Sequence, residues 1–278
     1  MTIQEEYARL QQQINDCDHK GDYVGLAGYM ERYLQLTGEI YGVESPQYGT
    51  VLNDYGGIHR DIGNYDKAEQ AFLQSAQLIG RLQGVGHPDY ASVQNNLAGL
   101  YRLMGQLDKA EQHFQQALQI YEQTVGKEHF LYISGMNNLG LVYQDMKRFA
   151  EAEVLHVHSL EALEQAGDNP VAIATTLTNL ASARRQQGKL SEVQPLLEQA
   201  LRMYEAQLGR EHSLYAYGLN NLASYYMQIG EYGKAKIYYQ SAMEICKVLF
   251  GVGSRNYEVS LRNYELAGQR AAEQRGMQ

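Results

Sequence analysis

The chain has 278 residues, of which 44% are hydrophobic and 20% are charged, and its formal net charge at pH 7 is −9. This composition allows a substantial core and excludes global disorder, while the negative charge argues against binding to nucleic-acid phosphates. The two cysteines lie far apart, which is typical of a protein in a reducing compartment. No apolar run reaches 18 residues and the first residues are polar and acidic, so no membrane span and no secretory signal are expected. The sequence therefore predicts a cytoplasmic protein.

The N-terminal segment, residues 1–45, is predicted to form a divergent pair of helices from about Ile3 to Ile40. It matches the rest of the chain only weakly, through Gly21, Tyr23 and Gly42. An open stack of helices exposes an apolar face at each end, so this pair is expected to cap the stack or to bind a second copy of the chain.

A period of 42 residues predicts five helical repeats: 46–87, 88–129, 130–170, 171–212 and 213–254. Three columns of residues follow this period, with one residue deleted in the turn-rich segment 166–170. The columns are Gly21, Gly63, Gly105, Lys147, Gly188 and Gly230; then Gly42, Gly84, Gly126, Gly167, Gly209 and Gly251; then Tyr48, Tyr90, Tyr132, Ile173, Tyr215 and Tyr257. A repeat of this length is typical of a solenoid.

Each repeat is predicted to form two amphipathic helices that pack against each other. In the repeat 88–129 the first helix runs from about 89 to 104 and ends at Gly105, and the second runs from about 107 to 124. Gly126 is expected to close the second helix in a left-handed conformation. Because a single pair cannot bury its apolar face, the pairs must stack on one another.

The C-terminal segment, residues 255–278, matches only the first helix of a repeat, through Tyr257 and Asn263. Its polar sequence from Arg262, RNYELAGQRAAEQRGMQ, predicts a helix that caps this end of the stack.

The repeats resemble the tetratricopeptide repeat, and the resemblance covers residues 46–254. It is carried by Leu97, Ala98, Tyr101, Ala110 and Phe114 and their equivalents. The period of 42, the LNNLA core and the Gly-x-x-His joint resemble the kinesin-light-chain subclass, although the tyrosine column and the lack of a lysine-rich surface depart from it. The resemblance implies an all-α fold, a right-handed superhelical α-solenoid of antiparallel helix pairs whose first helices line a concave face.

Paired asparagines recur on the first helices, although asparagine is a poor helix former. They occur in NNLAGLY from Asn95, MNNLGLVY from Met136 and LNNLASYY from Leu219. At about 100° per residue, Asn96 lies about 150° from the centre of the core-facing side, so it is expected to face outward, whereas Asn95 lies on a flank. Nine asparagines in these two columns cost about 5 kcal/mol of helix propensity relative to alanine, which calls for a compensating role.

The outward column consists of Asn96, Asn138, Asn179, Asn221 and Asn263, with Asp54 at the equivalent place in the first repeat. In tetratricopeptide proteins an asparagine at this place commonly holds the backbone of a bound peptide, so the resemblance implies a peptide-binding groove lined by these residues. The alternative is that the amides bond neighbouring helices and only position the repeats. For the flanking column, which consists of Asn53, Asn95, Asn137 and Asn220, that structural role is favoured.

Three arginines, Arg60, Arg102 and Arg185, share a column on the flank of this predicted groove. A guanidinium group suits a carboxylate, so one interpretation is an acidic or C-terminal peptide as ligand. The alternative, slightly favoured, is that the arginines are solvated and pair with Asp61 or Asp145. The cationic positions of the two-carboxylate clamp in chaperone-binding tetratricopeptide domains hold Asn, Ser and Gly here, so that role is disfavoured.

The sequence predicts no catalytic residue, metal site or cofactor. His156 and His158 lie two residues apart on a predicted helix and face nearly opposite directions, so they cannot chelate one metal, and His156 is expected in the core. His87, His129 and His212 recur at the joints and are expected to brace the loops. No phosphate-binding loop and no supported nucleophile–base arrangement is found.

The predicted function is that of a protein- or peptide-binding adaptor or scaffold that holds an extended peptide in its concave face. No enzymatic activity and no nucleic-acid or membrane partner is expected. Three alternatives stay open: a sensor of a small signalling peptide that acts through a separate effector, a structural solenoid that forms homo-oligomers through its ends, and an enzyme with a hidden site.

Overall fold

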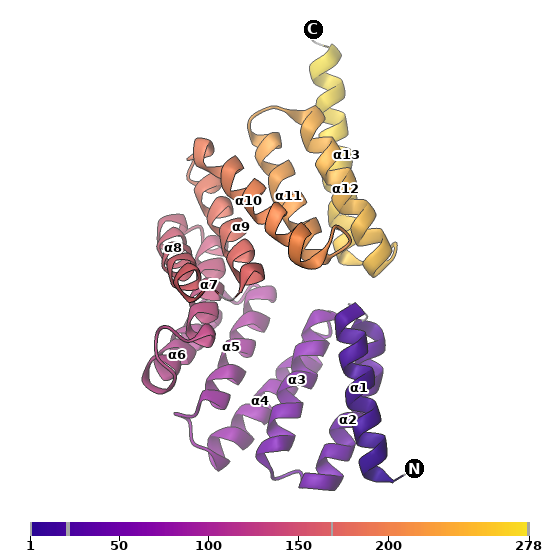
Figure 1. Cartoon of the computed structure of the whole chain (residues 1–278), viewed down its shortest axis with the longest axis vertical. Helices are drawn as coiled ribbons and strands as arrows, with labels where there is room; N and C mark the ends of the chain where they lie inside the picture. The colour runs from indigo at the N-terminus through magenta and orange to yellow at the C-terminus, as the bar shows by residue number, and fades with distance from the viewer. Residues whose placement is uncertain (1, 21–22, 168, 277–278) are drawn as a thin grey trace. The chain divides into compact units, whose positions relative to one another are not determined.

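The computed structural model describes residues 2–20, 23–167 and 169–276, so Gly21 and Asp168 lie outside the described residues. Within these ranges all regular structure is helical, which confirms the all-α prediction (Figure 1). The helices are α1 Ile3–Lys20, α2 Tyr23–Tyr41, α3 Pro46–Asp61, α4 Tyr65–Leu82, α5 Pro88–Leu103, α6 Leu107–Thr124, α7 Phe130–Asp145, α8 Phe149–Ala166, α9 Pro170–Gln186, the short 3-10 helix η1 Leu190–Glu192, α10 Val193–Leu208, α11 Ser213–Gln228, α12 Tyr232–Phe250 and α13 Arg255–Gly276.

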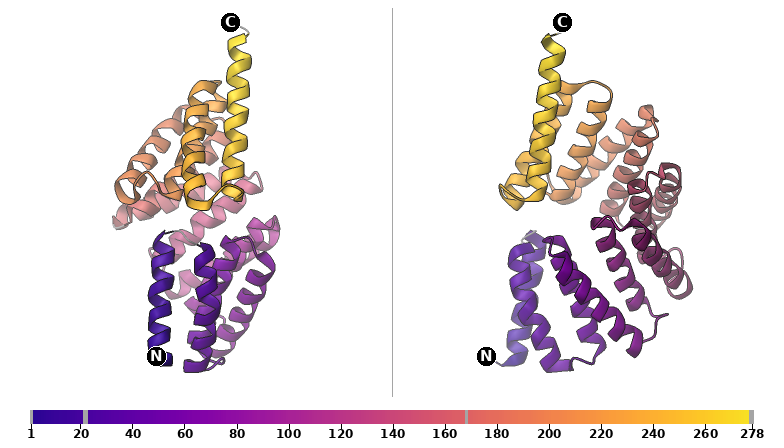
Figure 2. Two further views of the ribbon diagram at one scale, coloured as in Figure 1. Left: turned by 90° about the vertical axis from the view of Figure 1, so that its right-hand side faces the viewer. Right: turned by 180° about the vertical axis from the view of Figure 1, so that it is seen from behind.

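The chain divides into two compact units between Met146 and Lys147. In the first unit, α1 to α7 are arranged so that each helix packs against the next one along the chain, and α3, α5 and α7 also lie side by side (Figure 2). In the second unit, α8 to α13 follow the same rule, and α9 lies beside α11. Each unit is therefore a stretch of tetratricopeptide-like solenoid in which the first helices of successive pairs share one face.

Glycines with positive φ end the helices at the joints, as the two glycine columns predict. At Gly105, φ is 75°, and the next amide, Gln106 N–H, donates to the carbonyl oxygen of Tyr101 at 2.8 Å. Gly126 likewise has a φ of 89°. The left-handed conformation directs backbone N–H groups at the joint toward carbonyl oxygens that the helix end would otherwise leave without partners.

Lys147 occupies the place of a glycine in this column and adopts the same left-handed conformation, with φ of 62°. It is the one non-glycine residue with positive φ in the described part of the chain. A side chain in this conformation strains the backbone, because its Cβ approaches the following carbonyl oxygen.

The variant Lys147→Gly is expected to raise the free energy of unfolding by about 0.5–1 kcal/mol, because relief of the strain exceeds the entropy that glycine loses on folding. Urea unfolding followed by circular dichroism measures the change. Gly105→Lys is the matched control and should lower stability; a Lys147→Gly variant less stable than wild type would contradict the assignment of strain to this joint.

Histidine side chains begin three of the first helices. The Nδ1 atoms of His87, His129 and His212 accept from the backbone N–H of the residue two positions later, at 3.1, 3.2 and 3.1 Å respectively. The equivalent caps at the other joints are Ser45, Asn169 and Ser254. The loop-bracing role predicted for the histidines is thus confirmed, and it is the role of an N-cap.

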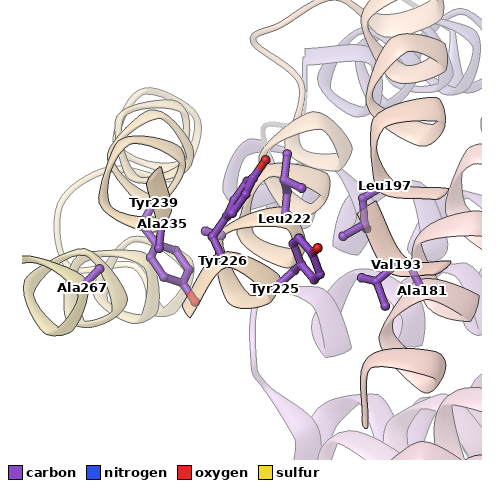
Figure 3. Packing of buried hydrophobic residues seen from close by; sticks show 10 residues of the cluster. Ala181, Val193, Leu197, Leu222, Tyr225, Tyr226, Ala235, Tyr239 and Ala267 are labelled. Carbon is purple, nitrogen blue, oxygen red and sulfur yellow. The ribbon is translucent and has the colours of Figure 1, made fainter. Parts of the chain in front are cut away.

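The core of each pair forms where a small residue lets the two helices approach. A Cβ added at Gly56 would lie 2.8 Å from the ring of Phe72, and the equivalent pair Ala98 and Phe114 is fully buried. Figure 3 shows the same arrangement in the second unit, where Ala181, Val193, Leu197, Leu222, Tyr225, Tyr226, Ala235, Tyr239 and Ala267 belong to one buried cluster. This packing fixes the rotation of the first helices and therefore which of their residues reach the surface.

His156 takes the Phe114 position in α8 and is fully buried, as predicted for a core histidine. Burial disfavours the charged imidazolium and lowers the pKa of His156 to about 4. The side chain is therefore neutral at pH 7.

A half-buried carboxylate, that of Glu153, joins α8 to the end of α9 in the second unit. Desolvation on its own would raise the pKa of Glu153, but hydrogen bonds from Lys189, Gln187 and Arg184 outweigh it and lower the pKa to about 2. Lys189 Nζ and Arg184 Nε lie 2.6 and 2.9 Å from its oxygens. These contacts tie α8 to the C-terminal end of α9.

Candidate functional site

A hollow of ≈ 380 Å³ lies on the face of the first unit that α3, α5 and α7 share. Its lining residues are Arg60, Asp61, Asn95, Asn96, Gly99, Arg102, Leu103, Phe114, Asn138 and Leu141. Four of the residues predicted to bind a peptide, Arg60, Asn96, Arg102 and Asn138, are thus brought together. Each comes from a first helix, because the core packing turns the opposite side of that helix inward.

Gly99 keeps this hollow open. A Cβ built at Gly99 would have only Arg60 Nη1 within 4 Å, at 3.5 Å, so the space above the backbone is empty of other protein atoms. Leu103 and Leu141 add apolar surface to the lining, and Leu103 is 44% exposed. The hollow therefore combines amides, guanidinium groups and exposed leucine surface, and the leucines were not among the residues predicted to bind a peptide.

Asn96 is half-buried and makes one bond to the preceding repeat. Its Nδ2 donates to Oδ1 of Asn53 at 3.0 Å, which ties α5 to α3. Within the residues that the structure describes, no donor pairs with Asn96 Oδ1, so this oxygen can accept from a ligand. The amide thus combines the two roles that the sequence left open, since one end positions a helix and the other lines the hollow.

The other amides of the first unit divide between the same two roles. Asn138 is half-buried and lines the hollow, whereas its neighbour Asn137 is buried. Asn53 is also buried and serves as the acceptor for Asn96. The structural role favoured for the flanking column therefore fits Asn53 and Asn137, while Asn95 lines the hollow instead.

Both arginines of the hollow are already paired with carboxylates. Arg60 Nε lies 2.9 Å from Asp61 Oδ1, and Arg102 Nε lies 2.7 Å from Oδ2 of Asp145, 43 residues further along the chain. The side chains of the arginines are 24% and 28% exposed. The alternative interpretation of the sequence, in which these arginines pair with Asp61 or Asp145, thus holds for both Arg60 and Arg102.

Asp54 lies outside this set of lining residues, although it occupies the place of Asn96 in α3. Its side chain is exposed. Desolvation raises the pKa of its carboxyl to about 6, but water reaches the exposed oxygens, and the group is ionised at pH 7 with or without this shift.

Helix geometry predicted that Asn179, in the second unit, faces solvent, but in the structure its side chain is buried. It is only 2% exposed, and its Oδ1 accepts from the phenol of Tyr217 at 3.1 Å. The expectation that Asn179 contacts a peptide directly is therefore corrected. The physical reason is the size of Tyr217, because the equivalent places on the other first helices hold the small residues Thr50, Ser92, Ser134 and Thr175.

Asn221 and Asn263 remain at the surface of the second unit. Asn221 is half-buried, and its Nδ2 donates to the carbonyl oxygen of Tyr217 one turn earlier at 3.0 Å. Asn263 is half-buried on α13. The flanking residue Asn220 donates to Ser260 Oγ at 3.5 Å, so it links α11 to α13 as expected of its column.

Arg185 lies at the end of α9 and contacts the end of α11. Its Nη1 donates to Oε1 of Gln228 at 3.2 Å, and Gln228 Nε2 donates to the backbone oxygen of Arg185 at 3.4 Å. Burial lowers the pKa of Arg185 from its ordinary value, although the group stays charged at pH 7. The arginine of this column in the second unit, Arg185, is thus paired with an uncharged side chain, that of Gln228.

Two other kinds of site are absent from the residues that the structure describes. These residues contain no group of three or more His, Cys, Asp or Glu side chains placed to hold a metal ion. None of the helices described is both long enough and apolar enough to cross a membrane.

A family model described as the tetratricopeptide repeat matches four overlapping segments of the chain: residues 47–123, 89–165, 131–206 and 172–248. No curated protein matches the chain.

Several solved structures share the fold. BtubC (BKLC) from P. vanneervenii is 20% identical with a TM-score of 0.58, and the alignment covers 92% of this chain and 95% of that one. Kinesin-light-chain-like repeats from Podosopora anserina are 21% identical with a TM-score of 0.57 and coverages of 75% and 100%. A Rap protein complexed with competence and sporulation factor is 13% identical with a TM-score of 0.66 and coverages of 99% and 78%.

Proposed function

Because the chain belongs to the tetratricopeptide repeat family, with repeats of the kinesin-light-chain-like type, we propose that it is an adaptor or scaffold. It binds an extended peptide segment of a partner protein. The single observation that carries the proposal is the hollow on α3, α5 and α7, which places the amides of Asn95, Asn96 and Asn138 beside exposed leucine surface. The two cysteines, which suit a reducing compartment, support a cytoplasmic location.

The chemistry of the hollow suits a main chain. A side-chain amide offers both a donor and an acceptor, so Asn96 and Asn138 can each pair with a peptide group whatever side chain the ligand carries there. Gly99 leaves room for the ligand backbone to come close, and Leu103 and Leu141 can bury an apolar ligand side chain. Arg60 and Arg102 also line the hollow. Each is paired with an aspartate, but its remaining N–H groups can still donate hydrogen bonds.

The proposed site in the second unit is more limited. Asn221 and Asn263 stay accessible, whereas Asn179 is covered by Tyr217 and is not part of the proposed site. The same proposal divides the chain into an N-terminal helical pair at 1–45, repeats over 46–254 and a C-terminal capping helix at 255–278. The proposed binding function does not require catalysis.

Filling the hollow tests the proposal. Gly99→Met is expected to weaken binding of peptides selected on wild type from an array by at least about tenfold, because its side chain occupies the space above Gly99. It should also raise stability, since glycine is a poorer helix former than methionine by about 0.8 kcal/mol. Fluorescence anisotropy measures the affinity, and thermal unfolding measures the stability.

Gly57→Met is the matched control. Gly57 holds the equivalent place on α3, has nothing within 4 Å of a built Cβ, and does not line the hollow. This variant should gain the same stability and keep its affinity. If both variants bind peptides like wild type, the hollow is not the binding site; if the array yields no binder at all, the proposed function fails.

A second candidate function is a sensor of a small signalling peptide, and it is suggested by the similarity in fold to the Rap protein solved with competence and sporulation factor. At 13% identity this similarity concerns the fold alone. A sensor must change shape when it binds, so small-angle scattering with and without a selected peptide separates the two candidates. An adaptor should keep its scattering profile, and a sensor should not.

A further inference from the structure

The first helices are linked by polar side chains that lie 43 residues apart in the sequence. In the first unit Arg102 of α5 pairs with Asp145 of α7. In the second unit Arg185 of α9 pairs with Gln228 of α11, and both residues hold the equivalent places in their repeats. In the second pair an uncharged amide takes the place of the carboxylate.

This difference leaves Arg185 without a counter-ion. No carboxylate of the described residues pairs with its guanidinium group, and the neighbouring ionisable groups that act on its pKa are the phenols of Tyr239 and Tyr217. A phenol does not act as a counter-ion near neutral pH, because its ordinary pKa is about 10. By contrast, Arg60 and Arg102 each have a carboxylate within 3 Å.

The surroundings of Arg185 favour an anion. The guanidinium group is half-buried, and a desolvated cation gains more from a carboxylate than a hydrated one does. Its fork carries five N–H donors, of which Nη1 is used for Gln228. Gln228 is exposed, so its side chain can turn to solvent and release Arg185.

We propose that Arg185 binds a carboxylate of the peptide ligand, and that Arg60 and Arg102 do not, because their own aspartates already occupy them. The carboxylate belongs either to an acidic side chain or to the C-terminus of the ligand, and both would form the two parallel hydrogen bonds that guanidinium favours. This inference rests on the proposed function and concerns the binding of a peptide by the second unit.

The test uses the full chain and peptides selected on an array, each made in variants that lose one carboxylate by Asp→Asn, by Glu→Gln or by C-terminal amidation. On wild type, one such change is expected to weaken binding by about tenfold, as for a charge-assisted hydrogen bond. On Arg185→Gln the same change should have no effect, and the arm that responds on wild type identifies the source of the carboxylate.

Two further variants provide matched controls. Gln228→Glu gives Arg185 the carboxylate that Arg102 has, so it should abolish the preference for the acidic peptide while keeping the fold. Arg102→Gln should keep the full tenfold preference. Thermal unfolding of each variant verifies that it is folded.

The outcomes separate the two hypotheses. If selected peptides bind but Arg185→Gln and Gln228→Glu retain the wild-type preference, or if no carboxylate contributes to binding, the assignment to Arg185 is wrong and the proposed function stands. If no peptide binds wild type, both are wrong.

Discussion

Replacing Asn96 and Asn138 together by alanine is expected to weaken binding of a selected peptide by roughly 30- to 100-fold, because each amide contributes about one hydrogen bond to the ligand backbone. The free energy of unfolding should stay within about 1 kcal/mol of wild type. Alanine gains about 0.6 kcal/mol of helix propensity at each site, and this offsets the lost bond between Asn96 and Asn53. Fluorescence anisotropy and urea unfolding measure the two quantities.

Asn179→Ala is the matched control for this double variant, because Asn179 belongs to the same column but is buried under Tyr217. It should cost about 1–3 kcal/mol of stability, since the Tyr217 phenol loses its acceptor, and it should leave peptide affinity unchanged. The reverse pattern, with loss of stability in the double variant and retained affinity, would assign the outward asparagines to structure alone.

His156→Phe is expected to remove about 2 kcal/mol of acid destabilisation at pH 5, and up to about 3 kcal/mol near pH 4. Burial lowers the pKa of His156 to about 4 from its ordinary value of 6.5. Between these two values the unfolded chain binds a proton that the folded chain does not, so stability from this group is complete above pH 6.5 and is lost as the pH falls toward 4. Phenylalanine is the residue found at the equivalent places 72 and 114.

The measurement compares urea unfolding of variant and wild type at several pH values between 4 and 7.5, and the prediction concerns the difference in slope. His158→Gln is the control, because His158 is exposed on the same helix two residues later. A pH dependence unchanged by His156→Phe would mean that the buried imidazole is already protonated or reaches water.

The architecture could be predicted because its determinants are local and recur. A glycine at each joint fixes the helix end, and a histidine, serine or asparagine begins the next helix, so the order of helices follows from the sequence period. Lys147 shows how strongly the neighbours impose this geometry, since it adopts the left-handed conformation without being glycine. The core histidine His156 followed from its place in the phenylalanine column.

The candidate site was less predictable, because it depends on contacts between repeats. Helix geometry places Asn179 outward but takes no account of the large Tyr217 one repeat later, which covers it. Similarly, the column of three arginines does not reveal which of them is paired with a carboxylate, because Arg102 and Arg185 each contact a residue 43 positions further along the chain. The signal was available for Tyr217, as it is the one bulky member of its column, but only a comparison across repeats reveals it.

The pairing of each first helix with the next has a consequence for how such a chain can evolve. The residue that neutralises Arg102 or leaves Arg185 charged is supplied by the following repeat, as Asp145 or Gln228. A recombination event that excised or duplicated one repeat would therefore give an arginine of a retained repeat a new neighbour without any substitution in that repeat. Changes in repeat number alone could then change which partners a descendant protein selects.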